Sequence, residues 1–106
     1  MNFFQINDFV GGWFIGNFSP AIENRDDFEV SVKYYKEGDK EARHLHKLAV
    51  EYTMIAKGRV KMNGQIIEAG TIVKIERNES TDFEVLEDTI TVVVKTPSIK
   101  NDKYTL

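Results

Sequence analysis

The feature that most constrains the fold is an alternation of apolar and polar residues that recurs along most of the chain. The stretch FEVSVKY, residues 28–34, alternates with a period of two and predicts a half-buried strand, since successive side chains of a strand point to opposite faces. Further runs rich in β-branched and aromatic residues predict more strands. They are EYTMIAKG (51–58), RVKMNGQII (59–67), TIVKIE (71–76), DFEVLE (82–87) and TITVVVK (89–95).

Short polar segments separate these runs and predict turns. The clearest is Asn63-Gly64, which lies between two alternating runs and suits the positive φ angles of a type I′ hairpin turn. A short helical turn is compatible with Pro20 in residues 20–27, but no longer stretch has a helical period. Many short strands joined by turns indicate an antiparallel sandwich or barrel. We therefore expect one all-β domain over residues 1–106, with residues 1–27 forming an N-terminal strand or lid.

Composition limits the classes of function. The 106 residues are the length of one ordinary domain, and 42% of them are apolar and 29% charged, as in water-soluble globular proteins. No apolar run approaches the roughly 20 residues of a transmembrane helix. The chain has no cysteine, which excludes disulfides and fits a cytoplasmic location. The net charge is −3 and basic residues alternate with acidic ones, so nucleic acid binding is not expected and a small molecule or a protein is the expected partner.

The segment TITVVVK suggests self-association. Every residue from Thr89 to Val94 is apolar or β-branched, so both faces of this strand can be buried. The interior of one barrel covers only one face. The second face would pack against loops of the other sheet or against another subunit, and we expect a homodimer.

The two histidines of the chain form a candidate metal site. His44 and His46 are two residues apart, so on a strand they project to the same side, and Glu51 follows after a short stretch in which the chain can turn back. Two imidazoles and one carboxylate, with open positions opposite, are the ligands of non-haem iron oxygenases. The sequence contains no phosphate-binding loop, dinucleotide-binding glycine motif or serine nucleophile elbow that would indicate another chemistry.

At this point the sequence resembles a known family. Gly38, His44, His46, Glu51 and Gly58 match the first conserved motif of the cupin superfamily at every fixed position. The resemblance extends over roughly residues 28–95 and is strongest for small single-domain cupins. It implies a double-stranded β-helix, which is a jelly-roll-like antiparallel barrel.

The second cupin motif is degenerate. Gly70 fits its opening glycine, but Glu76 stands where proline is expected and Asn78 where a second glycine is expected. Asparagine tolerates the left-handed conformation, so we expect the turn to survive. Thr81 stands where the family has its fourth ligand, a histidine.

The resemblance implies a divalent transition metal, Fe, Mn, Ni or Zn, held by His44, His46 and Glu51, with Thr81 at the fourth-ligand position. A threonine hydroxyl is a weak neutral ligand. Strand parity extends the site, because residues two apart share a face with Glu51 or with Thr81. The residues expected to line the pocket in this way are Thr53, Ile55, Phe83 and Val85.

Two functions remain open at the level of sequence. One is a metal-dependent enzyme acting on a small molecule, such as an oxygenase, an isomerase or a lyase. The other is a non-enzymatic dimer that binds a sugar or an organic acid and has a degenerate metal site. The sequence does not choose between them, because one fold carries many functions.

Overall fold

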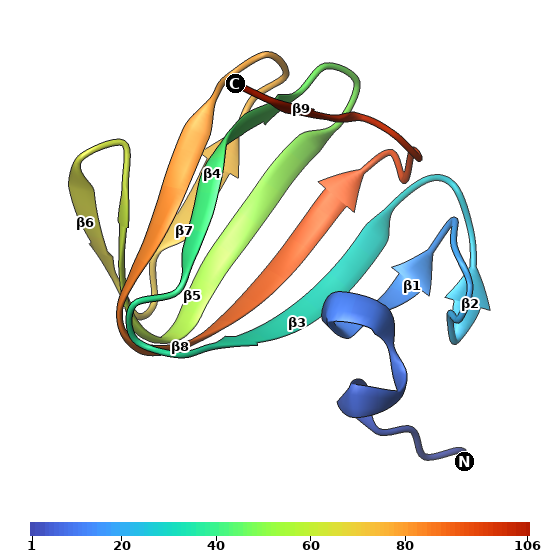
Figure 1. Ribbon diagram of the computed structural model, residues 1–106. Coiled ribbons are helices and arrows are strands. Elements are labelled where there is room, and N and C mark those ends of the chain that lie inside the picture. Colours follow the sequence, from blue (N-terminus) through green and yellow to red (C-terminus); the bar gives the residue numbers. More distant parts are fainter.

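The computed structural model describes residues 1–106 and consists of strands that curve into an open barrel, as Figure 1 shows. This confirms the expected all-β class. Two short 3-10 helices, η1 and η2, precede the first strand. In chain order the elements are η1 (Ile6–Asp8), η2 (Val10–Gly12), β1 (Trp13–Gly16), β2 (Glu23–Asn24), β3 (Glu29–Tyr35), β4 (Lys40–His46), β5 (Val50–Met62), β6 (Gln65–Glu68), β7 (Ile72–Ile75), β8 (Thr81–Thr96) and β9 (Lys103–Thr105).

Two long strands, β5 and β8, hold the barrel together. The first half of β5 pairs antiparallel with the second half of β8 and with β7. The last residues of β5 pair with β6 and with the first half of β8. β8 also pairs with β3 through its second half and with β4 through its first half. Every wall of the barrel therefore includes β5 or β8.

Gly58 allows β5 to bend between its two halves. The register of β5 against β8 shifts between Ile55 and Val60, and Gly58 has φ 94° within this irregular stretch. A Cβ atom at Gly58 would lie 2.7 Å from the Cα of Thr89, closer than real Cβ atoms approach. Only glycine fits both the left-handed conformation and the contact with β8. The second glycine of the first motif thus has a structural explanation.

The turns predicted from asparagine are present, whereas the predicted helical turn is not. Asn63 and Gly64 have φ 49° and 79° and close the hairpin between β5 and β6. Asn78 has φ 66°, so it takes the left-handed conformation expected at a glycine position of the second motif. In residues 20–27 the chain forms β2, which pairs with β1 in parallel.

β3 turns its polar side chains into the barrel. Glu29 and Ser31 are buried and Lys33 is half-buried, whereas Tyr34 is 66% exposed. The pairing with β8 explains this orientation, because Ser31 lies opposite Val93, which is also buried. The strand is half-buried as its alternation predicts, but the buried half is the polar one.

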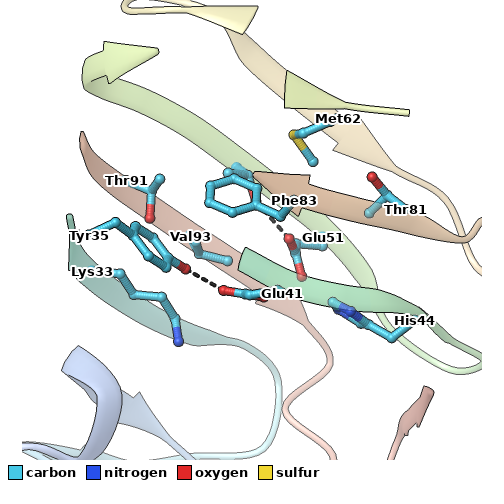
Figure 2. A pocket seen from close by; sticks show the side chains of 11 residues that line it. Lys33, Tyr35, Glu41, His44, Glu51, Met62, Thr81, Phe83, Thr91 and Val93 are labelled. Atoms are coloured by element: carbon cyan, nitrogen blue, oxygen red, sulfur yellow. Dashed lines mark hydrogen bonds between the residues drawn. The ribbon is translucent and has the colours of Figure 1, made fainter. Parts of the chain in front are cut away.

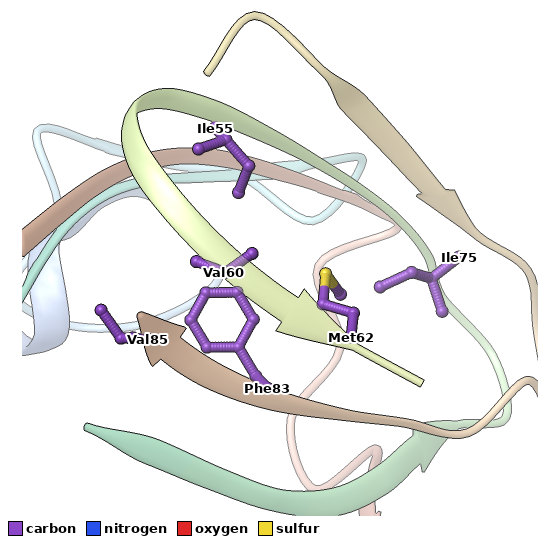
Figure 3. Close-up of a cluster of buried hydrophobic side chains, with 6 residues drawn as sticks. All are labelled: Ile55, Val60, Met62, Ile75, Phe83 and Val85. Atoms are coloured by element: carbon purple, nitrogen blue, oxygen red, sulfur yellow. The ribbon is translucent and has the colours of Figure 1, made fainter. Parts of the chain in front are cut away.

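The hydrophobic core lies at the closed end of the barrel, where the bent strands face each other. Val60 and Ile55 are fully buried, and Val85 is 2% exposed. Figure 3 shows these side chains directed toward one another from β5, β7 and β8. The cluster consists of Ile55, Val60, Met62, Ile75, Phe83 and Val85.

The C-terminal segment is joined to the loop between β4 and β5. β9 pairs with the end of β4, and the buried carboxylate of Asp102 precedes it. This carboxylate accepts hydrogen bonds from the backbone N–H groups of Lys47, Leu48 and Ala49, at 3.0–3.2 Å. Consecutive N–H groups that converge on one anion form a backbone nest. The nest fixes the loop that follows His46.

The helices in the structure are single 3-10 turns, and none has the length and apolar character needed to cross a membrane.

Candidate functional site

A small cavity of about 50 Å³ lies between the strands, next to the hydrophobic core, which contributes Met62 and Phe83 to its lining (Figure 2). Its walls come from four strands, β3, β4, β5 and β8. Both acidic and basic side chains reach it. The lining residues are Lys33, Tyr35, Glu41, His44, Glu51, Thr53, Met62, Thr81, Phe83, Thr91 and Val93.

Two carboxylates in the cavity are each held by a neighbouring hydroxyl group. Tyr35 donates a hydrogen bond of 2.6 Å to Oε2 of Glu41, and Thr53 donates one of 2.7 Å to Oε2 of Glu51. Burial and the hydrogen bond to Glu41 raise the pKa of Tyr35 far above its ordinary value. Tyr35 is therefore a hydrogen-bond donor to Glu41 at all physiological pH values. Each carboxylate keeps its second oxygen as a free acceptor.

Lys33 brings a positive charge to the same cavity. Burial lowers the pKa of its ammonium group, and the negative charge of Glu41 opposes this effect. The Nζ atom lies 5.2 Å from the centre of the Trp13 ring, which is within the range of a cation–π interaction. Lys33 is thus a cation near the carboxylates of Glu41 and Glu51, with an aromatic face beside it.

His44 is oriented by its own strand. Its Nδ1 atom lies 2.9 Å from the carbonyl oxygen of Ala42. Because a carbonyl oxygen only accepts, Nδ1 is the donor in this contact. A register shift between Glu41 and His44 places both residues at the cavity although they are three positions apart. The cavity therefore contains an imidazole whose Nε2 atom has no hydrogen-bond partner in the protein.

His46 lies beside the cavity without lining it. It is 6% exposed, and its ring centre lies 5.3 Å from that of His44. Its Nε2 atom is 3.4 Å from Nζ of Lys95. Burial, followed by the charge of Lys95, lowers the pKa of His46 to about 4, so the ring is neutral at pH 7. Because an ammonium group only donates, Nε2 of His46 accepts from Lys95.

The structure places two of the three expected metal ligands in the cavity and the third beside it. His44 and Glu51 line the cavity together with Thr81, but His46 contacts Lys95. No three His, Asp or Glu side chains in the structure are placed to hold a metal ion. The lone pair on Nε2 of His46 accepts a hydrogen bond from the positively charged ammonium group of Lys95. This donor arrangement does not fit a metal bound by His44, His46 and Glu51.

The expected pocket residues divide between cavity and core. Thr53 and Phe83 line the cavity, whereas Ile55 and Val85 belong to the hydrophobic cluster. The residues that sequence reasoning did not place in the cavity come from all four of its strands. The pairing of β3 with β8 brings two of these residues together, because it sets Lys33 opposite Thr91. The register between two strands cannot be deduced from the sequence of one strand alone. These residues are Lys33, Tyr35, Glu41, Met62, Thr91 and Val93.

The side chain of Thr91, which lines the cavity, has an unpaired hydroxyl group. Its side chain is 1% exposed, and Oγ1 has no hydrogen-bond partner in the structure. An unpaired buried hydroxyl group costs about 1–3 kcal/mol, so such groups are usually satisfied by water or by a ligand. Figure 2 shows Oγ1 of Thr91 on the side of Tyr35. Thr91 thus lines the cavity with its hydroxyl group unpaired in the protein.

Comparison with solved structures shows that the chain has the cupin fold. An uncharacterised conserved protein with a double-stranded β-helix domain from Klebsiella pneumoniae matches with a TM-score of 0.72 and 18% identity, over 98% of this chain and 90% of that one. Oxalate decarboxylase from Bacillus subtilis matches with a TM-score of 0.68 and 15% identity, over 76% of this chain but only 24% of its own length.

A polyketide cyclase from Streptomyces resistomycificus matches with a TM-score of 0.67 and 15% identity, over 77% of this chain and 62% of that one. The oxalate decarboxylase has Mn(II) centres. At these identities the likeness concerns the fold. No protein-family model matches the sequence, and no curated protein matches it.

Proposed function

We propose that the protein binds a small hydroxyl-bearing molecule, a sugar or a hydroxy acid, in the cavity between β3, β4, β5 and β8. The observation that carries this proposal is the buried, unpaired hydroxyl group of Thr91 inside a cavity lined by charged groups. A polar molecule supplies the missing partner. An apolar molecule would leave Thr91 and the carboxylates unsatisfied.

The free atoms of the cavity indicate which ligand groups are suitable. Glu41 and Glu51 each have one uncommitted carboxylate oxygen, and Nε2 of His44 has no partner in the protein. These acceptors require donors, and hydroxyl groups are the donors that uncharged small molecules carry in number. Lys33 supplies one ammonium group for an oxygen of the ligand. Acceptors thus outnumber donors, which favours a polyhydroxylated ligand over a simple anion.

The size of the cavity limits how much of the ligand is enclosed. About 50 Å³ holds a few water molecules or one hydroxyl-bearing end of a sugar. The remainder of the ligand would extend beyond the barrel mouth. Binding of this kind does not need a metal, and it corresponds to the non-enzymatic alternative that the sequence left open.

The proposal is tested by a ligand screen with matched variants. The native protein is titrated with a panel of pentoses, hexoses, polyols and small hydroxy acids, first by thermal shift and then by calorimetry. For a compound that binds, we expect Thr91→Val and Glu51→Gln each to weaken the affinity at least tenfold. Asp8→Asn, on the exposed N-terminal segment, serves as the control and should bind like the native protein.

Two results would contradict the proposal. One is that no member of the panel binds the native protein. The other is that a compound binds equally well to the native protein, Thr91→Val and Glu51→Gln, because its site would then lie elsewhere.

We also propose that the protein is a homodimer formed through the outer face of β3 and β8. On this face Val32 lies opposite Val92, and Tyr34, which is 66% exposed, lies opposite Ile90. A charge in the middle of an apolar interface is costly, so Val92→Lys should convert a dimer to a monomer. Light scattering coupled to size-exclusion chromatography measures the mass. A native protein that is monomeric at 100 µM would refute this proposal.

A further inference from the structure

Lys95 is a largely buried cation beside His46. It lies on β8, opposite Glu29 of β3 and opposite Glu51 of β5. Its Nζ atom is 3.3 Å from Oε2 of Glu29 and 3.4 Å from Nε2 of His46. The side chain of Lys95 is 15% exposed and that of Glu29 is 9% exposed. The ammonium group therefore has protein partners in place of most of its water.

The surroundings of Lys95 are themselves fixed. Oε1 of Glu29 accepts a hydrogen bond of 2.8 Å from Ser98, whose hydroxyl oxygen accepts one of 2.8 Å from the backbone N–H of Asn17. The ring of Trp13 has its centre 5.2 Å from Nζ of Lys95. A carboxylate, an imidazole lone pair and an aromatic face thus surround one ammonium group. Buried charges persist in proteins when they are paired in this way.

The position of this cation conflicts with a metal at the same motif. A metal bound through Nε2 of His46 needs the lone pair that now accepts from Lys95. A divalent ion within coordination distance of His46 would also lie close to the ammonium charge, and like charges in a poorly hydrated site repel strongly. Metal binding would therefore require the ammonium group of Lys95 to move away from His46.

We propose that the ammonium group of Lys95 is the resident cation of this site and that it excludes a metal ion from His44, His46 and Glu51. Lys95 is a specificity-determining residue, since its ammonium group occupies the place that a divalent metal ion would otherwise take beside His46. Removing its charge exposes a latent metal site. The inference concerns the cation alone and does not depend on the ligand proposed for the cavity.

The test compares metal affinity between charge-removing and charge-keeping variants. Zn²⁺ and Mn²⁺ are titrated into untagged native protein, Lys95→Met and Lys95→Arg, in competition with a chromogenic chelator. We expect Lys95→Met to bind Zn²⁺ at least tenfold more tightly than the native protein, and Lys95→Arg to bind no more tightly than the native protein. Adding His46→Ala to Lys95→Met should abolish the gain.

A second variant protects the test against a failure to fold. Lys95→Met leaves the carboxylate of Glu29 buried without its partner, which destabilises the protein. The double variant Glu29→Gln/Lys95→Met removes both charges and keeps the hydrogen bond to Ser98 within reach. Circular dichroism confirms that each variant is folded. The double variant should show the same gain in Zn²⁺ affinity.

Two results would overturn the inference. One is stoichiometric metal in the native protein that is lost in His46→Ala. The other is a folded Lys95→Met or Glu29→Gln/Lys95→Met variant with native-like Zn²⁺ affinity. A failure of the sugar and hydroxy-acid screen would affect neither measurement, so the two proposals fail independently.

Discussion

The carboxylate of Asp102 provides the most quantitative prediction. It accepts hydrogen bonds from three consecutive backbone N–H groups, those of Lys47, Leu48 and Ala49, and is itself 4% exposed. Hydrogen bonds to a charged group contribute about 1.5–3 kcal/mol each when they are buried, and less when water can replace the lost partner. Ala49 is buried, whereas Lys47 and Leu48 are exposed.

These burial differences set the expected loss of stability. In Asp102→Ala, the N–H of Ala49 loses its partner without access to water, at a cost of about 2–3 kcal/mol. The N–H groups of Lys47 and Leu48 can bind water and lose about 0.5–1 kcal/mol each. We therefore expect a total of about 3–5 kcal/mol for Asp102→Ala and roughly half of this for Asp102→Asn, which keeps one acceptor oxygen.

Urea unfolding monitored by circular dichroism measures the free energy of unfolding. Losses of this size are a large share of the 5–15 kcal/mol typical of a domain, so the midpoint should fall clearly while the slope stays constant. Asp8→Asn, an exposed aspartate, is the control and should stay within about 0.5 kcal/mol of native. A loss below about 1 kcal/mol for Asp102→Ala would refute the reasoning, because the nest would then contribute no more than a surface contact.

Three further predictions concern residues of the motif and the cavity. Gly58→Ala should cost about 3 kcal/mol or more in urea unfolding, since it adds a clash with Thr89 to the strain of φ 94°. Gly38→Ala, with φ 91° and nothing within 4 Å, should cost only about 1–2 kcal/mol, and equal costs would contradict the clash. Thr91→Val should leave the free energy of unfolding unchanged or raise it by about 1–3 kcal/mol, because it removes a buried hydroxyl group that has no protein partner, and a loss above about 1 kcal/mol would show that a partner exists. Because the folded-state pKa of His46 is lowered to about 4 from 6.5, the unfolded chain binds more protons between these values, and the free energy of unfolding should fall by up to about 3 kcal/mol from pH 6.5 to pH 4. Subtracting the profile of His46→Gln isolates this contribution, and parallel profiles would show that His46 does not titrate in this way.

The strands and turns could be predicted from the sequence because their signals are local. Asn63-Gly64 forms its hairpin, and Asn78 takes the left-handed conformation that a glycine has in the family motif. Each depends on the φ preference of one or two residues. The resemblance to the cupin motifs, which include such turns, predicted the fold that comparison with solved structures confirms.

The arrangement of the site could not be predicted, because it depends on partners far apart in the sequence. FEVSVKY is a strand, but its register against β8 turns Glu29, Ser31 and Lys33 into the barrel. The alternation of apolar and polar residues predicts that these polar side chains face solvent. It contains no information about the ion pair between Glu29 and Lys95. The contact of Lys95 with His46 is hidden for the same reason.

The central place of β8 has a consequence for the order of events during synthesis. β3, β4 and β5 all emerge from the ribosome before β8, yet each pairs with it. Thr81, Phe83, Thr91 and Val93 of β8 complete the cavity, so no partial chain that ends before residue 81 can form it. Until β8 is made, β3 and β4 lack their shared neighbour and expose unpaired edges. The cavity therefore forms only after β8 has been made, because strands made much earlier in the chain have to wait to pair with it.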